Sequence, residues 1–458
     1  MNKHKTYIDI ETFSSVDIRT AGLYKYAESE DFEILLIAYA IDGGDVELID
    51  LTDDSDITRQ KLAEVERILK SPNHIKYAHN AHFEMECLER ALHVVIRPSQ
   101  WECTMVKGMY RGYPASLEKM GEALDMPEDK AKLRAGKALI NYFCKPCKPT
   151  KTNGGRTRNL PKHALEKWEL FKEYCKRDVE VAREIDKMLP DVPQGVHTEW
   201  MRDYLINWRG IAVDEALVEA AIAIDEAVKS THLDKRITGV DNPRSRAQVL
   251  KWLNNTLDEE ITSLNAAAVK ELLESDLTDD ARAVLTAWQG IGKTSTKKYE
   301  TLKEATQRDG RVRGLLQFYG ASRTGRWAGR LVQPHNLPRG DVYELNQARE
   351  LVRAGRKADI ELLHGSIPKV LSGLIRTSFV PAEGCKFIIC DYSAIEARVL
   401  AWLAGEHWVL EEFKGDGKIY EATAARMYNL DKSTIVKGHP NYAYRQKGKI
   451  ATLALGYQ

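Results

Sequence analysis

Two carboxylates near the N-terminus have the spacing of a cation site. Asp9 and Glu11 alternate with Ile8 and Ile10 in a short run that favours a β-strand. Because successive side chains of a strand point to opposite faces, both acids share one face while both isoleucines point to a core. Two carboxylates on one sheet face need a cation. The alternative for an isolated Asp-x-Glu is a polar outer strand face.

Two further segments carry acids that could join this pair. Tyr174 and Asp178 lie four residues apart in a run with helical spacing of apolar residues, so the phenol and the carboxylate share one helix face. The run Asn80-Ala-His-Phe-Glu84 follows a strand-like segment over 75–78. Together with the first pair, these segments resemble the three motifs of DEDD 3′→5′ exonucleases of the Tyr type.

The resemblance implies a two-metal hydrolysis of a phosphodiester. Asp9, Glu11, Glu84 and Asp178 would hold two Mg²⁺ or Mn²⁺ ions, and Tyr174 would orient the attacking water. Glu84 departs from the family, in which this position is commonly Asp. The extra methylene can still reach a metal directly or through water, so activity is expected to survive. A Glu84 that cannot reach would leave a domain that binds 3′ ends without cutting them.

Near Asp391 the spacing of apolar residues changes from that of a strand to that of a helix. The apolar run 387–390 suits a buried strand, and apolar residues recur at helical spacing from Ile395 onward. This change predicts that Asp391 lies at the end of a strand, at a rim where a metal ion can be held. The alternative is an Asp that only caps the following helix.

A C-terminal segment combines cations with apolar positions. Arg445, Lys449, Leu453 and Tyr457 recur every four residues and share one helix face. Two cations a turn apart can meet a triphosphate, while the apolar and aromatic positions support a base and a sugar. A basic amphipathic helix is the alternative.

These last two segments resemble motifs A and B of family A DNA polymerases. By that resemblance Asp391 binds the catalytic metals, and the bulk of Glu396 helps to exclude a ribose 2′-hydroxyl. The four positions of the C-terminal helix would bind the incoming dNTP. Leu453 occupies a place often held by Phe or Tyr in relatives. By the resemblance, the residue at this place affects discrimination against sugar-modified nucleotides.

A segment between residues 324 and 339 is expected to contact DNA. Thr324-Gly-Arg326 and Pro334-His-Asn336-Leu-Pro-Arg339 are similar to the family's segment between thumb and palm. The resemblance implies that Arg326, Asn336 and Arg339 contact the primer-template, whereas a Gly/Pro-punctuated loop is the alternative. A basic group in the expected thumb would add to DNA binding. Its members are Lys293, Lys297 and Lys298.

The order of these motifs divides the chain. It predicts an α/β protein that begins with a ribonuclease H-like 3′→5′ exonuclease domain at 1–190, followed by a Pro-containing linker. A helical thumb is expected at 195–310, a partial palm at 311–435 and the start of the fingers at 436–458. Because no 5′-nuclease domain precedes the exonuclease, the chain resembles phage or prophage replicases.

Composition adds little about partners. Lys and Arg number 67, as do Asp and Glu, so the formal net charge of zero gives no whole-chain signal for nucleic acid. The N-terminus lacks an apolar signal region, and no apolar stretch is long enough to span a bilayer. We expect no membrane partner and a cytoplasmic location, in a bacterial host or a phage-infected cell.

The polymerase motifs lack a second metal-binding carboxylate. In the family a later His-Asp pair supplies it, and no such pair occurs after Asp391. Because one Asp cannot hold two metals, we expect an N-terminal portion of a polymerase with exposed apolar palm surface, and a C-terminal fragment is its candidate partner in trans. Two alternatives stay open: a stand-alone 3′→5′ exonuclease and a noncatalytic DNA-binding subunit.

Overall fold

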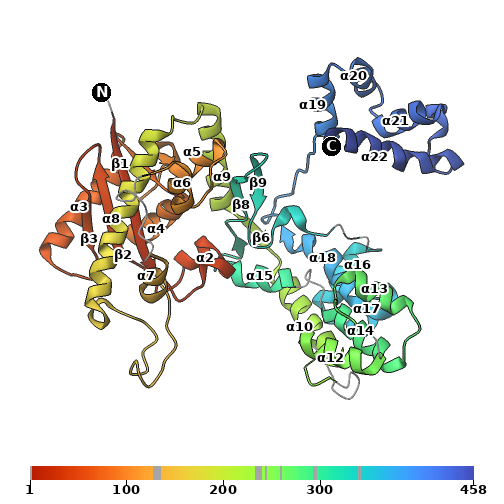
Figure 1. Cartoon of the computed structure of the whole chain (residues 1–458), viewed down its shortest axis with the longest axis horizontal. Coiled ribbons are helices and arrows are strands. Elements are labelled where there is room, and N and C mark those ends of the chain that lie inside the picture. The colour runs from red at the N-terminus through yellow and green to blue at the C-terminus, as the bar shows by residue number, and fades with distance from the viewer. Residues whose placement is uncertain are drawn as a thin grey trace. The chain divides into compact units, whose positions relative to one another are not determined.

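The chain forms two compact units, Met1–Glu383 and Gly384–Gln458. The computed structural model describes residues 3–126, 136–232, 240–242, 245–257, 260–291, 297–338, 340 and 342–457. Figure 1 shows both units, the second at the blue end of the chain.

A five-stranded mixed sheet organises the N-terminal part of the first unit, with the strand order β3-β2-β1-β4-β5. Its strands are β1 (His4–Phe13), β2 (Glu33–Ile41), β3 (Glu47–Asp50), β4 (His74–Ala78) and β5 (Trp101–Cys103). β1 pairs antiparallel with β2 and parallel with β4, so it lies at the centre. Ile8 and Ile10 are accordingly 2% and 4% exposed, which confirms the predicted core face of this strand.

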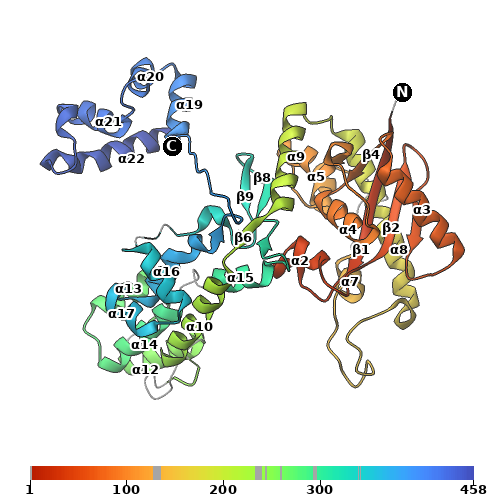
Figure 2. The ribbon, with the colours of Figure 1, turned by 180° about the vertical axis from the view of Figure 1, so that it is seen from behind.

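Helices cover both faces of this sheet. One face packs against α7 (Gly136–Phe143) and α8 (Leu165–Met188), and the other against α3 (Asp56–Lys70) and α4 (His82–Leu92). α8 lies in front of the sheet in Figure 1 and behind it in Figure 2. Shorter helices complete this part: α1 (Ile18–Ala21), α2 (Leu23–Ala27), α5 (Thr104–Tyr110) and α6 (Leu117–Ala123).

The next part of the first unit is mainly helical, as the sequence predicted for 195–310. Its helices are α9 (Gln194–Arg209), α10 (Glu215–His232), α12 (Arg246–Leu257), α13 (Ala266–Glu274), α14 (Asp279–Ile291) and α15 (Lys297–Ala305). α9 packs on the five-stranded sheet, because Trp200 and Tyr204 belong to the same apolar core as Ile8. Among the described residues, no helix combines the length and apolar character that a bilayer crossing requires.

Short strands and three helices end the first unit. A three-stranded sheet joins β6 (Ile211–Val213), β7 (Arg311–Val312) and β10 (Phe379–Val380), and a separate hairpin joins β8 (Leu316–Ala321) to β9 (Arg326–Gly329). The helices are α16 (Leu345–Arg353), α17 (Lys357–His364) and α18 (Ile367–Leu374). They share an apolar core with α10 and α15.

The second unit consists of helices. These are α19 (Ile395–Ala404), α20 (His407–Lys414), α21 (Ile419–Tyr428) and α22 (Tyr444–Tyr457). Gly448 permits the close approach of α22 to α21, since a Cβ at this position would lie 2.1 Å from the carbonyl oxygen of Tyr420. The predicted helices after Asp391 and around Arg445 are therefore confirmed.

The predicted buried strand over 387–390 is wrong. The backbone there has no regular structure, and Ile388 and Ile389 are 82% and 88% exposed. A strand needs a neighbour to pair its N–H and C=O groups, and no described strand pairs with this segment. The apolar side chains of this segment therefore stay exposed.

Candidate active site

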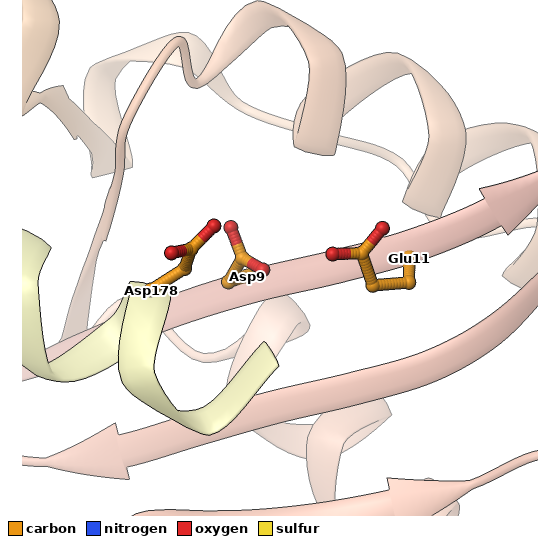
Figure 3. A group of neighbouring side chains, drawn as sticks. All are labelled: Asp9, Glu11 and Asp178. Carbon is orange, nitrogen blue, oxygen red and sulfur yellow. The ribbon is translucent and has the colours of Figure 1, made fainter. Parts of the chain in front are cut away.

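Three carboxylates converge where α8 crosses β1. Asp9, Glu11 and Asp178 each place one oxygen within 4.8 Å of the others (Figure 3). Glu11 and Asp178 are buried, at 8% and 5% exposed. Like charges this close, with little water around them, favour a bound cation or a retained proton. The sequence predicted all three residues at one site, and the structure brings them together.

Local packing fixes these side chains. Asp9 and Glu11 share the face of β1 opposite to that of the buried Ile8 and Ile10, and the register with β2 shifts immediately after Glu11. Asp178 lies on the buried stripe of α8, next to Val179, which is fully buried in the sheet core. The carboxylates are therefore held by a strand and a helix whose positions the core determines.

Glu84 lies beside this group. It sits in the first turn of α4, is 3% exposed, and lines the same cavity as Asp9, Glu11 and Asp178. Burial, and then the negative charge of Asp9, raise the pKa of Glu84 well above its usual range. Its Oε2 has no hydrogen-bond partner among the described residues. Glu84 thus faces the acid cluster with an oxygen left for a ligand.

Tyr174 is packed against the same acids. Its side chain is 1% exposed, and burial, followed by the charge of Asp178, raises its pKa, so the phenol is neutral at physiological pH. A hydrogen bond with Asp178 contributes to the shift, which matches the predicted contact four residues apart on α8. Gly136 makes room for the ring, since a Cβ there would lie 2.0 Å from Tyr174 Cε2.

Two thiols at this site were missed by the sequence analysis. Cys144 Sγ lies 3.7 Å from Glu11 Oε2, and Cys175 Sγ lies 3.7 Å from Asp9 Oδ2. Each thiol can donate a weak hydrogen bond to a carboxylate. For Cys175, its position directly after Tyr174 could have indicated that it lies near the site. Cys144 offered no such signal, because it is 133 positions away from Glu11 in the sequence.

The donor set fits a divalent cation. Buried carboxylate oxygens are hard ligands of the kind that Mg²⁺ and Mn²⁺ prefer, and the unpartnered Oε2 of Glu84 adds a fourth acid on the same cavity. Glu86, two residues further along α4, does not line this cavity, so Glu84 is the acid of α4 that faces the cluster.

The predicted polymerase residues lie in the second unit. Asp391 is exposed on irregular chain, and Glu396 is exposed in the first turn of α19. The described residues of this unit include no group of acids placed to share a cation. The structure therefore does not reproduce the predicted metal site at a strand end, because the strand that would hold Asp391 has not formed.

The predicted nucleotide-binding residues share one helix, α22. Arg445 Nε donates to Glu421 Oε1 of α21 at 2.7 Å, so its charge is paired within the unit. Lys449 and Leu453, one and two turns later, are partly exposed. Tyr457 ends the helix, and its side chain lies outside the described residues.

Only some of the residues predicted to contact DNA are exposed. Arg326 on β9 and Lys297 at the start of α15 are exposed, while Asn336 donates to Gln333 Oε1 at 3.2 Å. Lys298 Nζ donates to the carbonyl oxygen of Val332 at 2.5 Å, so this lysine braces the following loop. Lys293 and Arg339 lie outside the described residues.

Comparison with known proteins finds two families in the chain. The profile of DNA polymerase family A matches residues 221–457. The profile described as 3'-5' exonuclease matches residues 12–194, a range that contains Glu84, Tyr174 and Asp178.

Individual proteins similar to this chain are also DNA polymerases. A DNA polymerase of Bacillus phage SP02 is 49% identical over 455 residues, which cover 98% of this chain and 69% of the phage protein. DNA polymerase I of Lactococcus lactis subsp. lactis (strain IL1403) is 32% identical over 87 residues, or 19% of this chain and 10% of that polymerase.

A solved structure supports the fold. The POL domain of Pol1 from M. smegmatis, in complex with DNA primer-template and dNTP, is similar with a TM-score of 0.55 at 16% identity. The match covers 99% of this chain and 68% of that chain. The fold and the two profiles define a DNA-polymerising enzyme with a nuclease domain. The chain belongs to DNA polymerase family A, and its N-terminal part is a 3'-5' exonuclease domain.

Proposed function

We propose that the cluster of Asp9, Glu11 and Asp178 on β1 and α8, together with Glu84, is a two-cation site that removes nucleotides from single-stranded 3′ ends of DNA. The observation that carries the proposal is the convergence of three carboxylate oxygens within 4.8 Å. Their order along the chain, with Tyr174 before Asp178, supports a proofreading exonuclease.

The residues divide the work. Asp9, Glu11, Glu84 and Asp178 would hold the cations, Mg²⁺ or Mn²⁺, which when bound would polarise the phosphodiester and neutralise its charge. Tyr174 keeps its proton because its pKa is raised, and its hydroxyl orients the attacking water. The water oxygen bonds to phosphorus as the bond to the 3′-oxygen of the preceding nucleotide breaks, which releases a 5′-mononucleotide.

The match to DNA polymerase family A over residues 221–457 supports a role in DNA synthesis. Here Asp391 would bind a catalytic metal and Glu396 would exclude ribonucleotides. A dNTP would lie along α22, at Arg445, Lys449, Leu453 and Tyr457. A primer-template would contact Arg326, Asn336 and Arg339, with Lys293, Lys297 and Lys298 as further cations.

The proposed domain boundaries follow the order of the motifs along the chain. The exonuclease domain is 1–190, the thumb 195–310, the palm 311–435 and the start of the fingers 436–458. A role on DNA, together with a phage relative, favours the cytoplasm of a bacterium or a phage-infected cell.

A hydrolysis assay tests the exonuclease. The full chain is incubated with a 3′-labelled single-stranded oligonucleotide and Mg²⁺ or Mn²⁺, and the products are separated by size. We expect labelled 5′-mononucleotide from the wild type and none from Asp9→Ala. Intact substrate with both metals in the wild type would instead favour the noncatalytic DNA-binding subunit.

Primer extension tests the polymerase. The reaction is run with and without a C-terminal polymerase fragment added in trans. Extension that appears only with the fragment supports a divided polymerase site. Neither extension nor association would favour the stand-alone exonuclease.

A further inference from the structure

A buried ion cluster lies near the C-terminal end of α8, apart from the acids of the candidate site. Asp186 is 4% exposed, and its carboxylate accepts hydrogen bonds from three side chains. Lys5 Nζ and Tyr7 Oη each lie 2.7 Å from Asp186 Oδ2, and Lys107 Nζ donates to Asp186 Oδ1. A carboxylate removed from water needs such donors, so the three side chains fix the position of Asp186.

The donors come from two other elements. Lys5 and Tyr7 belong to β1, and Lys107 belongs to α5, which directly follows β5. Lys107 is 1% exposed, and its Nζ also lies 2.5 Å from Asp191 Oδ1 in the segment that joins α8 to α9. The cluster therefore ties the end of α8 to the central strand and to a helix at the edge of the sheet.

The strand and the helix joined here are the two that carry the acids. Tyr7, Asp9 and Glu11 alternate along β1, so their side chains point to one face of the sheet. Asp186 follows Asp178 on α8 by roughly two helical turns. The bond from Tyr7 to Asp186 thus sets the position of α8 along β1 two residues away from Asp9.

Near the acids, the contact between α8 and β1 includes a weak bond. Cys175 Sγ lies 3.7 Å from Asp9 Oδ2 and 3.9 Å from the carbonyl oxygen of Asp9, and a thiol is a weak donor. The negative charges of Asp9 on β1 and Asp178 on α8 repel each other before a cation binds. Charge-assisted hydrogen bonds are roughly twice as strong as neutral ones. The ion cluster around Asp186 can therefore oppose this repulsion.

We propose that Asp186 is a positioning residue that, through Tyr7, Lys5 and Lys107, sets the spacing between the acids of β1 and Asp178 of α8. Asp186 does not line either cavity at the acid site, so it acts through the backbone of the two elements. A small displacement of α8 along β1 changes the separation of the cation ligands, and misplaced groups lower the rate steeply. This inference rests on the proposed exonuclease function.

Tyr7→Phe in the full chain is the mildest test. It removes one donor and leaves both lysines on Asp186, and Tyr7 does not line either cavity. We expect kcat on a single-stranded oligonucleotide to fall by about fivefold and the Mn²⁺ concentration for half-maximal activity to rise by a similar factor. KM for the oligonucleotide should stay unchanged. Asp186→Asn should shift kcat and the Mn²⁺ dependence further, because the charge that binds both lysines is lost.

The matched control is Tyr299→Phe. Tyr299 is fully buried and donates to the carbonyl oxygen of Leu371 at the same distance of 2.7 Å, in the apolar core that α10 shares with α15 and α16 to α18. It should lose a hydrogen bond of the same length while kcat and the Mn²⁺ dependence stay those of the wild type. A purely structural role of Tyr7 would lower the unfolding temperature without changing the Mn²⁺ dependence.

The outcomes separate this inference from the proposed function. Wild-type kcat and Mn²⁺ dependence in Tyr7→Phe, or equal losses in Tyr7→Phe and Tyr299→Phe, would overturn the positioning role and leave the exonuclease in place. A wild type that hydrolyses no DNA would overturn the proposed function. Calorimetry with Mn²⁺ then decides the positioning role: weaker binding in Tyr7→Phe than in Tyr299→Phe would support it, and equal binding would overturn it.

Discussion

Glu84 is the residue at which the proposed exonuclease site departs most sharply from the pattern of the resembling family. Its carboxylate is buried, faces the acid cluster, and has one oxygen without a partner among the described residues. A longer side chain at this position still presents a carboxylate to the cavity. The substitution of Glu for the usual Asp therefore alters the reach of the ligand while keeping its charge.

Removal of the Glu84 charge should impair hydrolysis. We expect Glu84→Gln to lower kcat on a single-stranded oligonucleotide by roughly 10²-fold or more, because a cation ligand is lost. Glu84→Asp keeps the carboxylate and should stay within about tenfold of the wild type. Steady-state kinetics with Mg²⁺ measure both, with the exposed Glu118→Gln as control. Equal rates for Glu84→Gln and the wild type would remove Glu84 from the site.

Glu86 predicts a pH dependence of stability. Burial, and then the charge of Glu89, raise the pKa of Glu86 to about 7. The folded state holds this proton while the unfolded state releases it near pH 4.5, so the contribution to stability falls as pH rises from 4.5 to 7. At pH 8 Glu86→Gln should be more stable than the wild type by roughly 1–3 kcal/mol, and at pH 4 equally stable.

Urea unfolding at the two pH values measures this difference, again with Glu118→Gln as control. A stability gain that is the same at pH 4 and pH 8 would mean that ionisation of Glu86 is not its cause.

Residue types and spacing predicted which acids lie together in the proposed exonuclease site, but not which residues surround them. Asp9 with Glu11, and Tyr174 with Asp178, are local patterns within one strand and one helix. The contacts of Cys144 and Glu84 with the cluster join segments distant in sequence. Only the folded sheet brings such segments together, so no local pattern predicts their distances.

Among the elements, helices were predicted better than strands. α8 has apolar residues at helical spacing, and α22 has Arg445, Lys449, Leu453 and Tyr457 at four-residue spacing; both helices form. The apolar run at 387–390 has strand-like composition, yet it remains irregular and exposed. Helices satisfy their own backbone groups, whereas a strand depends on a partner that its own residues do not specify.

The contact between α7 and α8 predicts an effect on catalysis. Gly136→Ala would place a Cβ 2.0 Å from the ring of Tyr174 and so displace the phenol. We expect kcat of the exonuclease to fall by about tenfold or more, with circular dichroism unchanged, because a positioned group is moved. Gly195→Ala is the control, since a Cβ there meets nothing within 4 Å. A wild-type kcat in Gly136→Ala would mean that the position of Tyr174 is not critical.

For the whole molecule, the exposed apolar segment predicts association. Phe387, Ile388 and Ile389 are 47%, 82% and 88% exposed on consecutive positions. Exposed apolar patches bind partners or aggregate. We expect the full chain to self-associate with rising concentration, and the double variant Ile388→Lys with Ile389→Lys to do so less. Sedimentation velocity measures both, and identical profiles would exclude this segment as the cause.

Net charge is also uninformative for the whole molecule, because 67 basic and 67 acidic residues cancel. Three of the acids, Asp9, Glu11 and Asp178, lie together where α8 packs on the sheet, and this cluster carries the proposed reaction.

Mn²⁺ titration by calorimetry tests the cation site most directly. The full chain should bind Mn²⁺, and Asp9→Ala should weaken that binding by about tenfold or more, because one of three converging carboxylates is lost. The exposed Asp53→Ala should bind as the wild type does. Equal Mn²⁺ affinity in Asp9→Ala and the wild type would contradict the assignment of a cation site to Asp9, Glu11 and Asp178.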